Sequence, residues 1–145
     1  ALREVRRVLR HDGRLALSVW GRAEDVPLVD AALSCLRRLL PPPKVARPSI
    51  FRFGDPAELA RCLAAAGYRD PEVRPVSITT AFPDAAAYWQ GFLDLAGGAA
   101  ESLSRLPPEK MQALAAAVAN DLAPHASKDG YVLSSTVLVA STGPV

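Results

Sequence analysis

The first stretch of the chain, residues 1–21, constrains the fold most strongly; it reads ALREVRRVLRHDGRLALSVWG. Apolar side chains recur at helical spacing over residues 1–10 with arginines opposite them, which predicts an amphipathic helix that buries Leu2, Val5, Val8 and Leu9. Asp12-Gly13 predicts a tight turn, because glycine adopts positive φ without steric cost. Residues 14–20 are nearly all apolar, as in a strand covered on both faces of an α/β sheet. Such a strand needs a neighbour at each edge, so we expect the chain to be the second half of a larger unit.

Helical and extended patterns alternate along the rest of the chain. A helix is predicted over residues 26–40, where prolines end it, and a loop over residues 44–54. Residues 72–82 alternate as in a strand, and Pro75, which has no N–H to donate, indicates that this strand lies at a sheet edge. A last strand is predicted over residues 131–140.

The clearest helix signal follows residue 54. Asp55 is a predicted N-cap, Pro56 suits the first helical position, Glu58 completes a capping box, and Gly67 is a typical left-handed terminator. The segment after the second strand contains no strand pattern. Its predicted helices span about residues 84–95, 101–106 and 107–124.

Two stretches, residues 1–21 and FRFGDPAELARCLAAAGYRDPEVRPV at residues 51–76, together resemble class I S-adenosylmethionine-dependent methyltransferases. The first resembles the helix, turn and fifth strand of that family, although the turn reads His11-Asp12-Gly13 where the group usually has Pro-Gly-Gly. The second resembles the helix and sixth strand. The nearest group is the small-molecule methyltransferases that include the quinone-biosynthesis enzymes.

This resemblance implies an α/β fold, the C-terminal half of a Rossmann-like methyltransferase domain. It implies a three-stranded mixed sheet of strands 14–20, 72–82 and 131–140, the last one central and antiparallel. The helical residues 83–128 would be an inserted cap of the kind that shapes a substrate pocket. We expect residues 1–145 to form a single domain or part of one. The family's glycine-rich cofactor loop has no counterpart, so S-adenosylmethionine belongs to the intact family and no cofactor is expected on this chain alone.

Composition excludes several classes of function. The 17 basic and 15 acidic residues leave a net charge of +2, which gives no electrostatic case for nucleic acid. No apolar run approaches the ~20 residues that span a bilayer, so no membrane association is expected. Cys35 and Cys62 have no histidine or cysteine at metal-ligand spacing, which predicts reduced thiols, a cytoplasmic location and no metal. The content of alanine and arginine suggests a GC-rich bacterial genome.

Catalytic groups are few. His11 lies in a predicted turn and His125 at a helix end, where we expect surface histidines rather than general bases. Methyl transfer from a sulfonium needs mainly in-line positioning and exclusion of water, so few polar groups are compatible with it. The catalytic residues stay unknown at this point.

Aromatic residues are the candidates for a substrate pocket. Trp20 closes the first strand, and open α/β sheets bind ligands beyond the carboxyl ends of their strands. The alternative for Trp20 is a packing role under the next helix. The other candidates are Phe51 and Phe53, which flank Arg52 in a loop, and Tyr88 and Trp89 on the cap. Adjacent Tyr88 and Trp89 cannot both face the same direction, so one is expected to pack inward and the other to face the pocket or solvent. For each residue taken singly, core packing is the favoured interpretation.

Three interpretations follow. The first is the substrate-side portion of a methyltransferase that acts on a small-molecule acceptor and is inactive without the cofactor-binding half. The second is a non-catalytic small-molecule-binding or dimerisation module derived from that fold, in which the unpaired edge of strand 14–20 joins two copies. The third is a compact remnant of proteolysis. A strand and a glycine-rich loop encoded upstream would favour the first.

Overall fold

A computed structural model describes residues 1–42 and 47–143 of the chain, which form two compact units. Unit 1 takes in Ala1–Val26, Arg47–Ile78 and the chain from Ser135 onward, and unit 2 takes in the chain from Pro27 together with Thr79–Ser134. Residues 43–46, which include part of the loop predicted over residues 44–54, lie outside the described residues. No described helix is long and apolar enough to cross a membrane.

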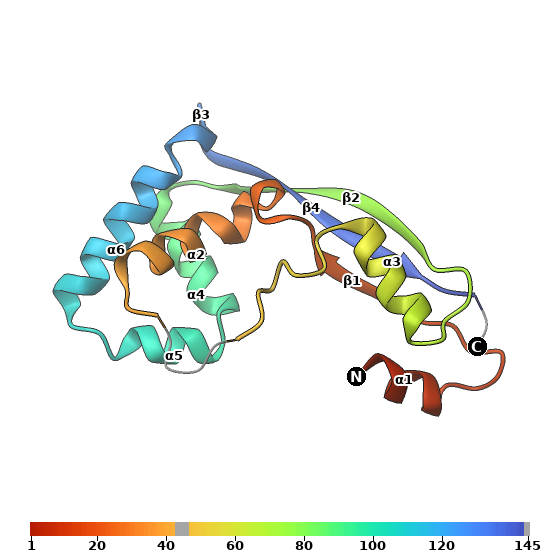
Figure 1. The fold of residues 1–145 in the computed structure, drawn as a ribbon. Coiled ribbons are helices and arrows are strands. Elements are labelled where there is room, and N and C mark those ends of the chain that lie inside the picture. The colour runs from red at the N-terminus through yellow and green to blue at the C-terminus, as the bar shows by residue number, and fades with distance from the viewer. Residues whose placement is uncertain (43–46, 144–145) are drawn as a thin grey trace. The chain divides into compact units, whose positions relative to one another are not determined.

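Unit 1 combines helices α1 (Leu2–Val8) and α3 (Pro56–Ala65) with strand β1 (Ala16–Trp20) (Figure 1). Two long strands, β2 (Glu72–Phe82) and β4 (Gly130–Ser141), contribute their residues up to Ile78 and from Ser135, respectively. The predicted range of β2 is confirmed at both ends, and β1 and β4 differ from their predicted ranges by at most two residues.

The strands are ordered β1-β4-β2, and a two-residue strand β3 (Ala126–Ser127) also pairs with β4. Strand β1 runs antiparallel to β4, in a register from Ala16 opposite Ser141 to Trp20 opposite Val137. The predictions that the last strand is central and antiparallel and that β2 lies at an edge are confirmed. The expectation of a three-stranded mixed sheet was wrong: the sheet is antiparallel and includes β3 as a fourth strand.

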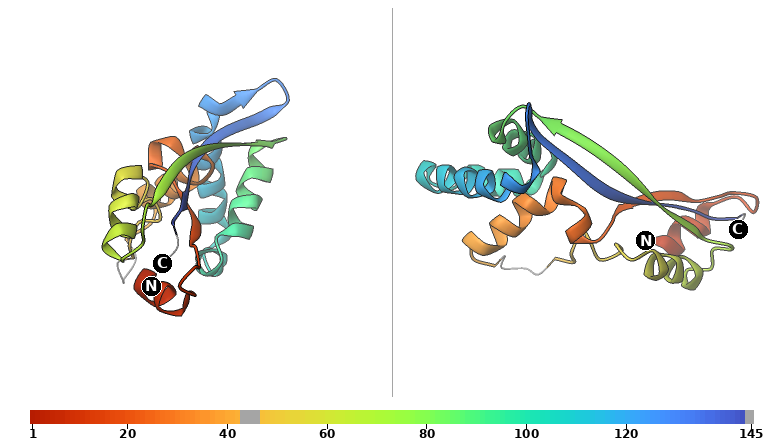
Figure 2. Two further views of the ribbon diagram at one scale, coloured as in Figure 1. Left: turned by 90° about the vertical axis from the view of Figure 1, so that its right-hand side faces the viewer. Right: turned by 90° about the horizontal axis from the view of Figure 1, so that it is seen from above.

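In unit 1, α3 lies along one face of the strands (Figure 2). The apolar core of this unit lies between them. Leu59 and Leu63 of α3 and Leu138 and Ala140 of β4 are all buried and belong to one apolar cluster. Leu63 has no exposed surface, and a Leu→Ala change at such a site costs about 2–5 kcal/mol of folding free energy. This cluster holds α3 against one face of the sheet.

Helix α3 begins and ends as predicted, with one difference at its first turn. The Asp55 carboxylate accepts hydrogen bonds from the backbone N–H groups of Ala57 and Glu58, and Gly67 ends the helix at φ +91°. Glu58 does not complete a capping box, because its carboxylate pairs instead with the Arg61 guanidinium one turn further along. The exposed ion pair replaces the second bond of the box.

The N-terminal segment is less buried than its pattern predicted. Leu2 and Leu9 pack against the unit 1 cluster, but Val5 is 39% exposed and Val8 is 68% exposed. The prediction that this whole apolar stripe is buried was therefore wrong, because no described element covers the side of α1 that carries the two valines. Strand β1 likewise alternates between exposed and half-buried residues instead of being covered on both faces.

Unit 2 is built from α2 (Pro27–Leu39), α4 (Ala85–Leu95), α5 (Gly98–Ser104) and α6 (Pro108–Asp121) (Figure 1). Helices α2, α4 and α6 contact one another, and α5 contacts α4. These helices confirm the predicted pattern, with ends displaced by up to three residues. Their shared core contains the buried residues Ala32, Cys35, Tyr88, Trp89, Phe92, Leu103, Leu114, Val118, Leu122 and Leu133.

Candidate functional site

The carboxyl end of β1 meets the start of α3 at a close backbone contact. A Cβ atom placed on Gly54 would lie 2.5 Å from the carbonyl carbon and oxygen of Gly21, so only glycine fits at residue 54. Gly21 itself donates its N–H to the carbonyl of Thr136 at 2.9 Å, which fixes it to β4. The absence of a side chain at Gly54 therefore brings the loop ahead of α3 against the end of β1.

An ion pair reinforces this junction. The Arg22 guanidinium donates to the Asp55 carboxylate at 2.6 Å, and the same carboxylate caps α3. Hydrogen bonds from the backbone N–H of Glu58 and from Arg22 lower the pKa of Asp55 below its ordinary value. The hydrogen bond to Asp55 in turn raises the pKa of Arg22. Asp55 is thus occupied as a structural cap, and its carboxylate is not available as a free base.

Trp20 is the last residue of β1 and stands beside this junction. Its side chain is half-buried, and its backbone lies opposite Val137 of β4. Its place at the carboxyl end of a strand agrees with the prediction, and its role as a pocket wall stays a prediction.

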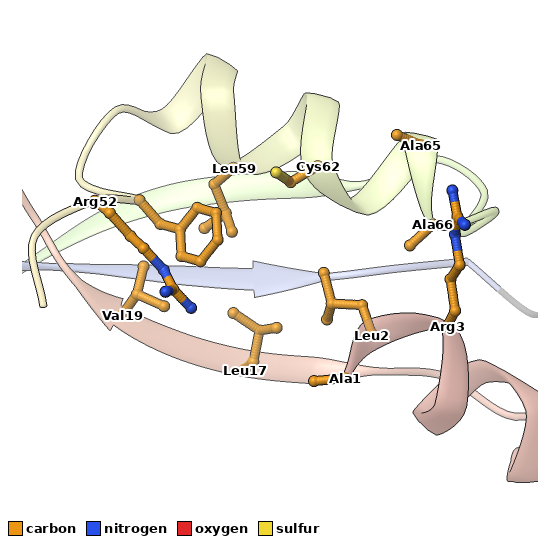
Figure 3. A pocket seen from close by; sticks show the side chains of 11 residues that line it. Ala1, Leu2, Arg3, Leu17, Val19, Arg52, Leu59, Cys62, Ala65 and Ala66 are labelled. Carbon is orange, nitrogen blue, oxygen red and sulfur yellow. The ribbon is translucent and has the colours of Figure 1, made fainter. Parts of the chain in front are cut away.

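A cavity of about 560 Å³ opens in unit 1 between β1, α1 and α3 (Figure 3). We call it the β1–α3 groove. Its apolar lining comes from Leu2, Leu17, Val19, Phe53, Leu59 and Ala66. Volumes of about 300–1,000 Å³ are usual for small-molecule sites, so the groove has the size of a ligand site.

Arginine side chains are the charged groups among the residues that line the groove. Arg52 lies over β1 near Val19, and Arg3 lies at the other end beside Ala66 (Figure 3). The Arg52 guanidinium carbon is 4.7 Å from the centre of the Phe53 ring, within the range of a cation–π contact. The electrostatic character of the groove is therefore positive above an apolar floor.

Only one of the aromatic candidates lines this groove. Phe53 does so, whereas Phe51 is half-buried in the turn before it and is not among the lining residues. The structure therefore brings Phe53 together with Arg52 and with residues of β1 and α3 that the sequence pattern did not single out, such as Leu17 and Cys62.

Tyr88 and Trp89 both lie in the core of unit 2, with 1% and 8% of their surface exposed. The prediction that one of them faces a pocket or solvent was wrong, because α4 contacts α2, α5 and α6 and two adjacent side chains can both be buried. Core packing, the favoured interpretation of each, is confirmed. Trp89 stacks on Phe92 with ring centres 5.7 Å apart, and Tyr88 meets the Phe82 ring edge-on at 5.3 Å.

The Tyr88 hydroxyl links α4 to the first turns of α2. It accepts a hydrogen bond from the N–H of Ala32 at 3.2 Å and donates one to the carbonyl of Leu28 at 3.1 Å. Burial raises the pKa of Tyr88 to about 12. Sequence analysis did not find this link, because a helical repeat of apolar residues carries no signal for where a phenol oxygen finds partners.

The remaining candidate reactive groups are the two cysteines, the two histidines and the acidic side chains. Within residues 1–42 and 47–143, no three or more His, Cys, Asp or Glu side chains are placed to hold a metal ion. Cys35 and Cys62 are both free thiols, and burial raises the pKa of Cys35. His11 is exposed, as predicted, whereas His125 is half-buried at the end of a 3₁₀ turn.

A search of protein-family models and of curated protein sequences finds no match to this chain.

Proposed function

We propose that this chain is the C-terminal, substrate-side portion of an S-adenosylmethionine-dependent methyltransferase that acts on a small molecule. One observation carries the proposal: β4, late in the chain, lies antiparallel between β1 and β2. In the family that residues 1–21 and 51–76 resemble, the seventh strand takes this place between the fifth and the sixth. The helices α1 and α3 precede β1 and β2 in the order that the resemblance implies.

The described residues do not fit the cofactor itself. Strand β1 is followed by a single glycine, Gly21, and β2 by Pro83, so neither strand leads into the glycine-rich loop that would hold S-adenosylmethionine. No step of methyl transfer is therefore assigned to a residue of this chain. Its contribution to such an enzyme would be acceptor binding, with Trp20 at the carboxyl end of β1 as the candidate contact.

The proposal is tested by titration calorimetry with S-adenosylhomocysteine. The 145-residue chain is expected to give no heat at millimolar ligand, and the chain extended by the residues encoded upstream is expected to bind at micromolar concentration. Methyl transfer from labelled S-adenosylmethionine by the 145-residue chain alone would contradict the proposal. So would an upstream sequence without a strand and a glycine-rich loop.

A second candidate, a dimerisation module, rests on the outer edge of β1. This strand is terminal in the order β1-β4-β2, so its second edge has no partner among the described strands. Exposed edges pair with other chains unless charges or bulges prevent it. Light scattering at micromolar concentration is expected to give a dimer mass for the wild type and a monomer mass for Ser18→Lys, because Ser18 is exposed on β1. A monomeric wild type would contradict this candidate.

A further inference from the structure

The β1–α3 groove carries positive charge at its rim. Its floor is apolar, yet Arg3 and Arg52 stand over it, and no acidic side chain is among its lining residues. Guanidinium groups are usually paired with carboxylates or exposed to water; Arg3 and Arg52 are exposed, and no salt bridge is formed by either among the described residues. Arg22 and Arg61, nearby in the same unit, follow that rule by pairing with Asp55 and Glu58.

Of the two arginines, Arg52 is the better placed to bind an anion in the groove. Its guanidinium carbon lies 4.7 Å from the centre of the Phe53 ring, a cation–π contact that leaves its N–H groups able to donate hydrogen bonds. No carboxylate of the described chain lies within ion-pair distance of it. Figure 3 shows the Arg52 side chain extending into the groove with its guanidinium beside Val19, at the end opposite Arg3.

We propose that the β1–α3 groove binds an anionic amphiphile: a monocarboxylate with an aliphatic or aromatic tail. The carboxylate accepts paired hydrogen bonds from the Arg52 guanidinium, the geometry in which arginine binds carboxylates most strongly. The tail lies on the half-buried side chains of Leu2, Leu17 and Val19 and removes their remaining apolar surface from water. The site uses no cofactor and no step of methyl transfer, so its test is separate from that of the methyltransferase proposal.

The first test is calorimetric titration of the chain with decanoate, and with decanol and decyltrimethylammonium as neutral and cationic ligands with the same tail. Decanoate is expected to bind about tenfold more tightly than either. Arg52→Gln is expected to lower the affinity for decanoate by about tenfold and to leave decanol unchanged. Arg61→Gln is the matched control, because Arg61 lies on α3, pairs with Glu58 and does not line the groove.

The two thiols supply a readout of where the ligand binds. Cys62 is half-buried and lines the groove, whereas Cys35 lies in the core of unit 2 with no exposed surface. Saturating decanoate is expected to slow alkylation of Cys62 by N-ethylmaleimide, and peptide mass spectrometry follows both thiols in the same sample. Alkylation of Cys35 reports unfolding and should stay slow throughout.

Three results would overturn the proposal: equal affinity for decanoate and the cationic ligand, equal effects of Arg52→Gln and Arg61→Gln, or Cys62 alkylation that decanoate does not slow. Arg52→Lys separates charge from geometry, because lysine keeps the positive charge but loses the planar fork that donates paired hydrogen bonds to a carboxylate. Its affinity for decanoate is expected to fall between those of the wild type and Arg52→Gln. None of these results depends on whether S-adenosylhomocysteine binds.

Discussion

Replacing Tyr88 with phenylalanine removes one buried hydroxyl group, and its surroundings set the expected cost. The hydroxyl accepts from the N–H of Ala32 and donates to the carbonyl of Leu28, and each such bond contributes about 0.5–1.5 kcal/mol net. These two backbone groups are four residues apart on α2, the spacing of an α-helical hydrogen bond. Tyr88→Phe is therefore expected to lower the free energy of unfolding by about 1–2 kcal/mol at neutral pH.

Ionisation of the Tyr88 hydroxyl is expected to lower the free energy of unfolding in alkali. Burial raises the pKa of Tyr88 from 10.0 to about 12, so above pH ~10 the unfolded chain releases a proton that the folded chain retains. The stability that the fold gains by keeping Tyr88 protonated is fully present below pH ~10 and is lost as the pH rises toward 12. Between pH 8 and pH 11 the loss amounts to about 1.4 kcal/mol, and it is absent in Tyr88→Phe.

The measurement is urea unfolding at several pH values, followed by the fluorescence of Trp89. Trp89 lies in unit 2 with Tyr88, so a Trp20→Phe background removes the signal of unit 1. Tyr131→Phe is the matched control, because Tyr131 is half-buried and belongs to the same unit. The reasoning is refuted if Tyr88→Phe and wild type lose the same stability between pH 8 and pH 11, or if the two tyrosine variants have equal stability at pH 7.

Gly54→Ala is expected to destabilise the chain by about 1–3 kcal/mol in thermal unfolding, because its Cβ would meet the Gly21 backbone at 2.5 Å. Gly91→Ala within α4 should instead be neutral or stabilising, and equal effects would contradict the backbone-contact argument. Asp55→Asn keeps an N-cap without the charge. Above pH ~4 the wild type is expected to be more stable than Asp55→Asn, and this difference in stability should disappear as the pH falls through the lowered pKa of Asp55. Acid unfolding of both proteins, followed by circular dichroism, checks this expectation. Val8→Lys should change the stability of this chain by less than about 0.5 kcal/mol, since Val8 is 68% exposed; a larger change would show that α1 packs through that face.

Local signals in the sequence predicted the elements well. Asp55, Pro56 and Gly67 set the ends of α3 because capping and positive φ depend on neighbours within a few residues. Pro75 predicted the edge position of β2 for an equally local reason, because proline has no N–H to donate to a second neighbouring strand. The central place of β4 came from the family resemblance and not from its own apolar pattern.

Contacts between distant segments could not be predicted in this way. The exposure of Val5 and Val8 depends on what covers α1, which a helical repeat does not specify. The approach of Gly54 to Gly21 joins two loops, and the groove beside Arg52 collects side chains from three segments. Of the predicted site residues, Phe53 is the one that lines the cavity, and its neighbour Arg52 was named only as the residue between Phe51 and Phe53.

The path of β4 has a consequence for the order in which the chain becomes structured during synthesis. Leu133 completes the core of unit 2, and Leu138 and Ala140 complete the core of unit 1. Because β4 follows every other described element, a ribosome has translated all the helices before either core can close. Nascent chains halted before residue 133 are therefore expected to expose apolar surface and to need protection from aggregation, and release of β4 then lets both units fold.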